Sequence, residues 1–230
     1  GGRSGLREQL GIAVSTTPYG QSALIANVSP QEAHNGLAFE RFTEEGPMAL
    51  LPLADNRCAL VWTRATLEAE RLSELGDAAF LAELQHAFGY RLGSLRQVGA
   101  RHLYPLALTA AKEQVRQHLV VLGNAAHSLH PIAGQGYNLS LRDTQVLAET
   151  LLASDAPLGD LATLQGYLNS QQMDQQLTVG FSDQVTRLFS TGQPLLAAGR
   201  NLGLLGLDLL PPAKRWFARQ AMGLGTRSEH

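Results

Sequence analysis

The chain has 230 residues, 44% of them hydrophobic, which is enough for a substantial core in one or two domains. Its net charge of -2 and its pI of about 6.4 argue against a nucleic-acid-binding protein, which usually carries a basic face. The single cysteine, Cys58, excludes an internal disulfide and predicts a reducing, cytoplasmic location.

The first quarter of the chain predicts an antiparallel sheet. Residues 22–30, 37–43 and 57–65 alternate apolar and polar side chains with the period of a half-buried strand. Turn-forming residues at 46–47 and 54–56 separate these runs.

Helical spacing follows the predicted sheet. Asp77 is placed to cap a helix whose apolar residues recur at helical intervals, namely Phe80, Leu81, Leu84 and Phe88. Residues 98–108 are extended again, and Pro105 favours an edge or a bend there. The short apolar run 118–122 is typical of a strand buried on both faces, as in a parallel sheet.

The last third of the chain is predicted to be helical. One helix begins near Asn138, residues 155–159 interrupt the pattern, and a long helix spans roughly 160–190. Two shorter helices are expected around Pro211 and Pro212. The apolar stretch 194–210 is too short and too polar to cross a membrane, so we expect a buried or surface-lying helix.

The stretch GNAAHSLHPIAGQGYNLSLRD, residues 123–143, lies between the predicted strand and the helix. Gly134 and Gly136 carry no Cβ and permit close approach of a ligand, and Pro131 adds a rigid apolar wall. The unpaired N–H groups at the start of the helix favour an anionic group. These residues predict a site for a flat group that carries or develops negative charge, although a simple tight turn explains the glycines equally well.

Other chemistries are less well supported by this stretch. His127 and His130 have a helical spacing, but no third ligand accompanies them, so no metal site is predicted. A serine hydrolase is disfavoured because the G-x-S-x-G motif is absent from the sequence. No catalytic residue can be named.

The run HPIAGQGYNLSLRD, residues 130–143, resembles the signature of the ubiquinone-biosynthesis hydroxylases, which are flavin-dependent aromatic monooxygenases. Residues 38–53 and 104–108 resemble the 2-octaprenyl-6-methoxyphenol hydroxylase branch. The resemblance implies an α/β fold with the character of an α+β fragment. The implied fold is that of the p-hydroxybenzoate hydroxylase-like flavoproteins without the N-terminal Rossmann unit, and it has an antiparallel substrate-side sheet and C-terminal helices.

The chain departs from this family in two ways. Asn124 stands where the family usually has an aspartate that contacts the ribityl chain of FAD, and no G-x-G-x-x-G motif is present. The residues Gly1 to Arg7 resemble the end of a second family motif, so we expect the C-terminal part of a longer enzyme. Its expected domains are a remnant of the FAD-binding domain (1–16), a substrate-side β-sheet domain (17–110), the C-terminal part of the FAD-binding domain (111–153) and a helical region (154–230).

The resemblance assigns roles to individual residues. Asn124 would face the ribityl chain, Pro131 would lie beside the flavin ring, and the ring's pyrimidine edge would meet Gly134, Gln135, Gly136, Tyr137 and Asn138. NAD(P)H would reduce FAD, and a C4a-hydroperoxide would hydroxylate a phenol. We expect the chain alone to lack bound FAD.

Further residues are weaker candidates. Phe39, Arg41, Leu60 and Trp62 are placed to face the substrate if the sheet is oriented that way, and otherwise belong to ordinary core and solvent faces. Ser4 and Arg7 resemble positions near the pyrophosphate and nicotinamide path, with a disordered terminus as the alternative.

The expected partners are a prenylated phenol substrate, other ubiquinone-biosynthesis proteins and a membrane surface met peripherally at the inner face, with no nucleic acid. An interfacial helix would present the basic and aromatic residues Lys214, Arg215, Trp216, Phe217 and Arg219, which suit a solvated helix equally well. Two other functions stay open: a non-catalytic binding or assembly module that docks through the C-terminal helices, and a related flavin halogenase or epoxidase.

Overall fold

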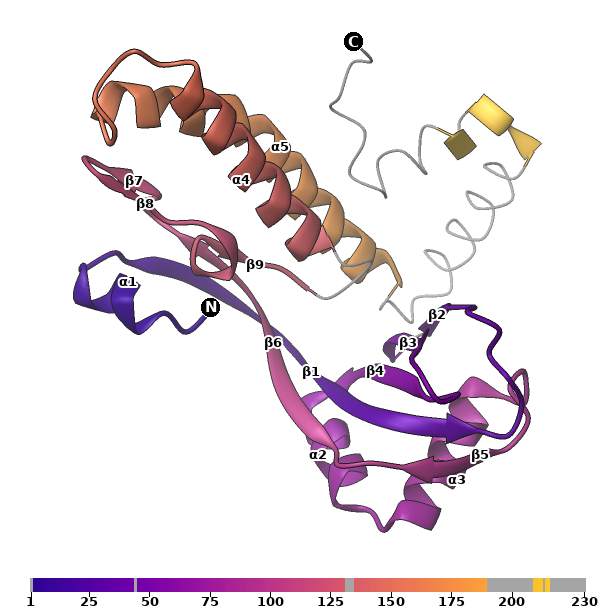
Figure 1. Cartoon of the computed structure of the whole chain (residues 1–230). Helices are drawn as coiled ribbons and strands as arrows, with labels where there is room; N and C mark the ends of the chain where they lie inside the picture. The colour runs from indigo at the N-terminus through magenta and orange to yellow at the C-terminus, as the bar shows by residue number, and fades with distance from the viewer. Residues whose placement is uncertain (1, 44, 131–134, 190–208, 213, 216–230) are drawn as a thin grey trace. The chain divides into compact units, whose positions relative to one another are not determined.

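The computed structural model describes residues 2–43, 45–130, 135–189, 209–212, 214 and 215, and these form two compact units (Figure 1). The sheet unit comprises the described part of Pro18–Leu106 and Phe189–Gly192. The helical unit comprises the described parts of Gly1–Thr17, Ala107–Leu188 and Gln193–His230. Two long strands, β1 (Val14–Pro30) and β6 (His102–Ala111), contribute residues to both units.

The sheet unit contains the predicted antiparallel sheet. Its strands are paired in the order β2-β3-β4-β1-β6, and β5 pairs with the end of β1. The remaining strands are β2 (Phe39–Thr43), β3 (Gly46–Pro52), β4 (Cys58–Ala65) and β5 (Leu95–Val98). The prediction of strands in the first quarter is therefore confirmed, and β3 is an additional strand that the sequence pattern did not indicate.

Two helices, α2 (Thr66–Glu74) and α3 (Asp77–Phe88), cover one face of this sheet. The helix predicted from Asp77 is confirmed, although Gly76 occupies the capping position and Asp77 lies in the first turn. Gly89 ends α3 in the left-handed region, with a φ of 82° that favours glycine. Helix α2 was not predicted.

The core of the sheet unit lies between these helices and the covered face of the sheet. Trp62 and Phe80 meet edge to face with their ring centroids 6.0 Å apart, and both side chains are almost completely buried. The other large members of this core are Leu24, Met48, Leu50, Leu60, Leu72, Leu84 and Phe88. Alternate residues along β1, β3 and β4 supply the sheet's share, as the two-residue period of a strand requires.

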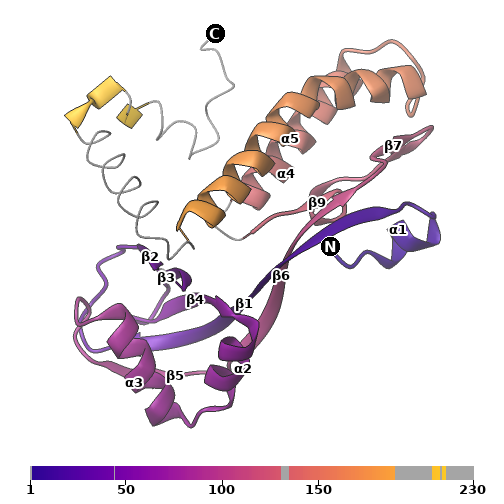
Figure 2. The same cartoon turned by 180° about the vertical axis from the view of Figure 1, so that it is seen from behind.

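The helical unit pairs two long antiparallel helices with short strands. Helices α4 (Gln135–Leu152) and α5 (Leu161–Phe189) lie side by side in both views (Figures 1 and 2). The smaller elements are α1 (Gly5–Gln9), β7 (Val115–Arg116), β8 (Leu119–Val120), the 3-10 turn η1 (Gly123–Ala125) and β9 (His127–Ser128). Strand β9 pairs with β6 through Thr109–Ser128 and Ala110–His127.

The apolar run 118–122 differs from its prediction. Leu119 and Val120 pair antiparallel with β7 and are only half-buried, so the expectation of a parallel strand buried on both faces is wrong. The turn between the two strands is fixed at His118, which has a φ of 62° and whose backbone N–H donates to Gly159 O at 2.9 Å. A parallel strand requires a neighbour that runs in the same direction, and among the described residues β8 pairs with β7 alone.

The two long helices agree with the sequence pattern. Helix α4 begins at Gln135, three residues before the predicted start, and α5 matches the predicted span of 160–190 closely. Asp160 caps α5, since its carboxylate accepts a hydrogen bond from Thr163 N at 2.9 Å. Apart from exposed Leu209 and Leu210, the predicted helix at 194–210 lies outside the described residues. No described helix is long and apolar enough to span a membrane.

Candidate functional site

The buried Arg7 connects the beginning of the chain to η1. Its guanidinium donates hydrogen bonds to Ala125 O at 2.8 Å and to Gly2 O at 3.1 Å. Ser4 caps α1 by accepting from Arg7 N at 3.2 Å, so Ser4 and Arg7 are ordered parts of the helical unit. The first residues of the chain and the stretch around Asn124, which sequence reasoning linked only by resemblance, thus form one surface.

Asn124 is the exposed residue of this surface. It lies in η1, and its side-chain amide makes no hydrogen bond with the other described residues. Gly123, with a φ of 62°, turns the chain immediately before it, and a Cβ at that glycine would come within 3.8 Å of Ser140 Oγ on α4. The Asn124 amide is therefore free to donate to or accept from a hydroxyl-rich ligand.

The start of α4 supplies the second part of the site. Gln135 is buried, Gly136 and Asn138 are half-buried, and Tyr137 is exposed. The N-terminal turn of a helix is its positive end, because its backbone N–H groups point away from the helix body. Gly136 is helical, and among the described residues a Cβ added there would meet only Leu129 Cβ, at 3.9 Å. Pro131 and Gly134 lie outside the described residues.

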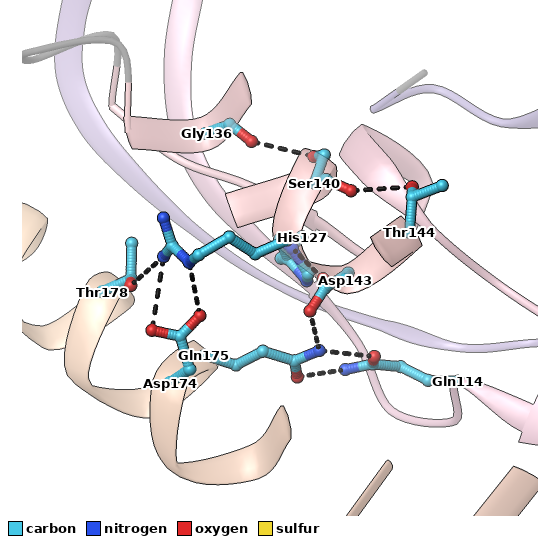
Figure 3. Close-up of polar contacts among 10 residues, drawn as sticks. Gln114, His127, Gly136, Ser140, Asp143, Thr144, Asp174, Gln175 and Thr178 are labelled. Carbon is cyan, nitrogen blue, oxygen red and sulfur yellow. Dashed lines mark hydrogen bonds and ion pairs between the residues drawn. The ribbon is translucent and has the colours of Figure 1, made fainter. Parts of the chain in front are cut away.

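A buried polar network runs beneath this surface (Figure 3). His127 Nε2 on β9 lies 3.2 Å from Asp143 Oδ2 on α4, and both side chains are almost completely buried. The other carboxylate oxygen, Asp143 Oδ1, accepts from Gln175 Nε2 on α5 at 3.2 Å. The amide of Gln175 also pairs with Gln114 in both directions, at 3.1 and 3.3 Å.

Sequence reasoning did not single out Asp143, Gln175 or Gln114. A signal was available for Asp143, because it follows Leu139 by four residues and precedes Val146 by three, which places a carboxylate on the apolar face of α4. A buried carboxylate needs partners, and this spacing alone would have pointed to a polar network in the interior. The partner residues from α5 and from the segment before β7 could not be inferred.

The two histidines of the motif occupy the protein interior. His127 faces Asp143, and burial lowers the pKa of His130 to about 4, so the His130 ring is neutral at pH 7. No group of three potential metal ligands occurs among the described residues.

The residues suggested to face a substrate lie on the covered side of the sheet. Phe39 stacks edge to face with Phe88 at 5.6 Å, and the Arg41 guanidinium lies over the same ring at 5.2 Å. Leu60 and Trp62 are buried beneath α2 and α3. The alternative interpretation, in which these residues belong to the ordinary core and solvent faces of the sheet, is therefore correct, because the helices occupy this face.

The opposite face of the sheet is not covered by α2 or α3. Ile25, Val61 and Ala49 are cross-strand partners in register on this face and are half-buried. Phe42 and Leu51 lie farther along the same face, with 38% and 42% of their surface exposed. The sheet unit thus presents a largely apolar patch built from alternate residues of β1 to β4, with the exposed polar residues Glu40 and Asn27 beside it.

Comparison with known proteins identifies the family. A sequence model described as "FAD binding domain" matches residues 1–170. The ubiquinone hydroxylase UbiL of Rhodospirillum rubrum is 41% identical over 97% of this chain and 53% of its own length. The 3-demethoxyubiquinol 3-hydroxylase of Escherichia coli is 31% identical over 97% of this chain and 58% of its own length.

A solved structure confirms the predicted fold class. The anhydrotetracycline hydroxylase OxyS of Streptomyces rimosus matches all of this chain and 46% of its own, with a TM-score of 0.70 at 20% identity. The fold is that of the p-hydroxybenzoate hydroxylase-like flavoproteins, and the chain spans about half the length of the curated relatives it matches. From the match over its first 170 residues, the chain belongs to the FAD binding domain family.

Proposed function

We propose that this chain is the C-terminal half of an FAD-dependent monooxygenase that hydroxylates a prenylated phenol in ubiquinone biosynthesis. The observation that carries the proposal is the surface formed by Asn124 on η1 and the first turn of α4, with the N-terminal residues held against it by Arg7. The names of its relatives, a ubiquinone hydroxylase and a demethoxyubiquinol hydroxylase, support the choice of substrate class.

The described residues fit the ring and ribityl part of FAD. The Asn124 amide is exposed and unpaired among the described residues, which suits contact with ribityl hydroxyls. The N–H groups of Gln135, Gly136 and Tyr137 begin an 18-residue helix, which suits an electron-rich ring edge. Asn138 follows in the same turn, and Pro131 and Gly134 keep the roles that the family resemblance implies.

Bound FAD, reduced by NAD(P)H, would supply two electrons to dioxygen, so that one oxygen atom enters the phenol ring and the other leaves as water. The chain's own contribution is to orient the two reactants and to exclude bulk water. The positive end of α4 would stabilise negative charge on a ring edge held there, and Gly136, which has no Cβ, would let a flat group approach the backbone.

The prenylated substrate would use the apolar face of the sheet unit. Ile25, Ala49 and Val61 form its centre, and Phe42 and Leu51 extend it. Burial of isoprenoid carbon on such a face is worth about 25 cal/mol per Å². Longer prenyl chains should therefore bind more tightly, whereas the phenol head group alone should bind weakly.

The test is turnover of phenols of increasing prenyl length by the full-length protein in detergent. We expect the apparent KM to fall steeply with chain length, and Leu51→Ser to raise it for the longest substrate. The matched control is Leu67→Ser on α2, an apolar residue that is 82% exposed and away from this face. Equal KM values across the series, or a preference for an unprenylated acid such as p-hydroxybenzoate, would assign the protein to small-phenol hydroxylation.

A further inference from the structure

We infer that His127, Asp143 and Gln175 are positioning residues. They fix the two described parts of the proposed cofactor surface relative to each other. The two parts are Asn124 on η1 and the first turn of α4 from Gln135 to Asn138. This inference rests on the proposed function, because the surface that the network holds in place is the proposed cofactor surface.

The network joins both parts close to the cofactor surface. His127 follows Asn124 by three residues, and Asp143 lies two helical turns beyond Gly136 on the same helix. His127 Nε2 and Asp143 Oδ2 approach to 3.2 Å without the geometry of a hydrogen bond, and this contact brings β9, the strand after η1, against α4. Only 3% of His127 and none of Asp143 is exposed.

The second oxygen of Asp143 fixes the network to the rest of the helical unit. Gln175 donates to Asp143 Oδ1, and its amide is oriented by two hydrogen bonds with Gln114. Gln175 belongs to α5 and Gln114 to the segment before β7, so two further elements define where Asp143 lies. The carboxylate thus accepts a hydrogen bond from Gln175 on one oxygen and faces His127 Nε2 with the other, so contacts on both sides restrict the position of α4.

Two neighbouring residues, Arg142 and Tyr167, argue that Asp143 is not needed merely to join α4 to α5. Arg142 already binds Asp174 on α5 at 2.7 Å, so the adjacent residue is not needed for a helix-to-helix ion pair. The buried hydroxyl of Tyr167 has no hydrogen-bond partner among the described residues. Burial and the charge of Asp143 raise the pKa of Tyr167. Keeping a carboxylate in this interior is costly, and a geometric function accounts for that cost.

Asp143→Asn tests the inference in the 230-residue chain. Asparagine removes the negative charge and replaces one of the two acceptor oxygens by an NH2 donor, so Asp143→Asn weakens a network in which Gln175 donates to the carboxylate and His127 faces it. We expect backbone amides at 124–130 and 135–138 to exchange hydrogen about tenfold faster, with a smaller change in the rest of the helical unit. Gln175→Met should accelerate the same amides by a smaller factor, and it provides the test if Asp143→Asn fails to fold.

Two matched variants separate positioning from general stability. Asp174→Asn removes the other carboxylate between α4 and α5, and Tyr167→Phe removes the hydroxyl beside Asp143 that has no partner. Neither should accelerate these amides selectively. If Asp143→Asn and Asp174→Asn accelerate the same amides equally, or if Asp143→Asn accelerates the whole helical unit uniformly, the positioning role is wrong.

A second measurement uses the full-length flavoprotein. Asp143→Asn should shift the flavin absorption band and raise the Kd for FAD at least about tenfold, or 1.4 kcal/mol, while Tyr167→Phe leaves both unchanged. An unchanged spectrum and Kd in Asp143→Asn would overturn the inference. If the unmodified protein binds no FAD, the proposed function fails instead, and the exchange measurement alone decides whether the network holds the two parts in register.

Discussion

At the scale of single residues, the free amide of Asn124 has the most direct consequence for cofactor affinity. In the full-length protein, Asn124→Asp should tighten FAD binding by about 1 kcal/mol, because a carboxylate makes stronger hydrogen bonds to hydroxyl groups. Asn124→Leu should weaken binding by leaving a ribityl hydroxyl unpaired. Titration of the apoprotein with FAD measures both effects, and equal affinity of the leucine variant and the unmodified protein would remove Asn124 from the cofactor site.

Gly136 tests whether the flavin ring approaches the start of α4. Its backbone is helical and, within the part of the chain that the structure describes, an added Cβ meets only Leu129 at 3.9 Å, so Gly136→Val should change the stability of the apoprotein by less than about 1 kcal/mol. The same side chain would occupy the space of the ring, so the full-length variant should lose flavin. The ratio of flavin to protein after purification is the measurement, and normal occupancy would mean that the glycine has no role in binding.

The buried ring of His130 makes stability depend on pH. Its pKa in the folded protein is about 4, below the 6.5 of a free histidine, so the unfolded chain binds the proton more readily. The protein is most stable above pH 6.5, where the ring is neutral in both the folded and the unfolded chain. As the pH falls towards 4, protonation of the unfolded chain lowers the free energy of unfolding by a total of about 3 kcal/mol. Urea unfolding at several pH values should show a smaller pH dependence for His130→Gln. The control, His102→Gln, replaces an exposed histidine and should keep the original slope.

At the scale of elements, the connection between α4 and α5 packs closely against the turn between β7 and β8. Gly159 has a φ of 89°, and a Cβ there would lie 2.8 Å from His118 Cα and even closer to His118 Nδ1. Gly159→Ala should therefore destabilise the helical unit by about 1–3 kcal/mol. Gly166→Ala is the matched control, because Gly166 is an exposed residue within α5 with open space around it, and it should stabilise by up to about 1 kcal/mol. Chemical denaturation of both variants gives the comparison, and equal stability would show that the turn adjusts freely.

Periodicity accounts for the elements that could be predicted. The strands β1, β2 and β4 alternate clearly, and α3, α4 and α5 show helical spacing over many residues. Strand β3 was overlooked because Gly46 and Pro47 resemble a turn, although they begin the strand. Helix α2 was overlooked although its apolar residues are segregated to one side more clearly than those of α3; it is short, with nine residues, and follows β4 directly. An apolar run such as 118–122 cannot reveal the direction of its partner strand.

The sequence predicts only those residues of the candidate site that lie close together within one motif. Asn124 and Gly136 lie within one continuous motif and could be found there. The network of Asp143, Gln175 and Gln114 depends on contacts between residues 32 and 61 positions apart in the sequence. Which face of the sheet the helices cover also depends on packing, so alternation alone left open whether Phe39 and Trp62 face a substrate or the core.

At the scale of the whole molecule, the proposed site would hold only part of FAD. Its residues are assigned to the ring and the ribityl chain, and the 230 residues contain no G-x-G-x-x-G motif for the pyrophosphate. The chain expressed alone should therefore lose FAD during purification and should show no NAD(P)H oxidation. Absorbance spectra of the purified chain measure retention, and a stoichiometric flavin band would contradict this expectation.

The contacts of Arg7 have a consequence for how the protein can evolve. Its guanidinium binds the carbonyl oxygens of Gly2 and Ala125, and every amino acid supplies such an oxygen. A Cβ at position 2 would lie in ordinary contact with Ser128, at 3.7 Å. This contact therefore requires a particular side chain at position 7 alone, and it places no requirement of its own on the side chains at positions 2 and 125. Covariation between positions, which reports side chains that change together, will not reveal this contact even in a deep alignment.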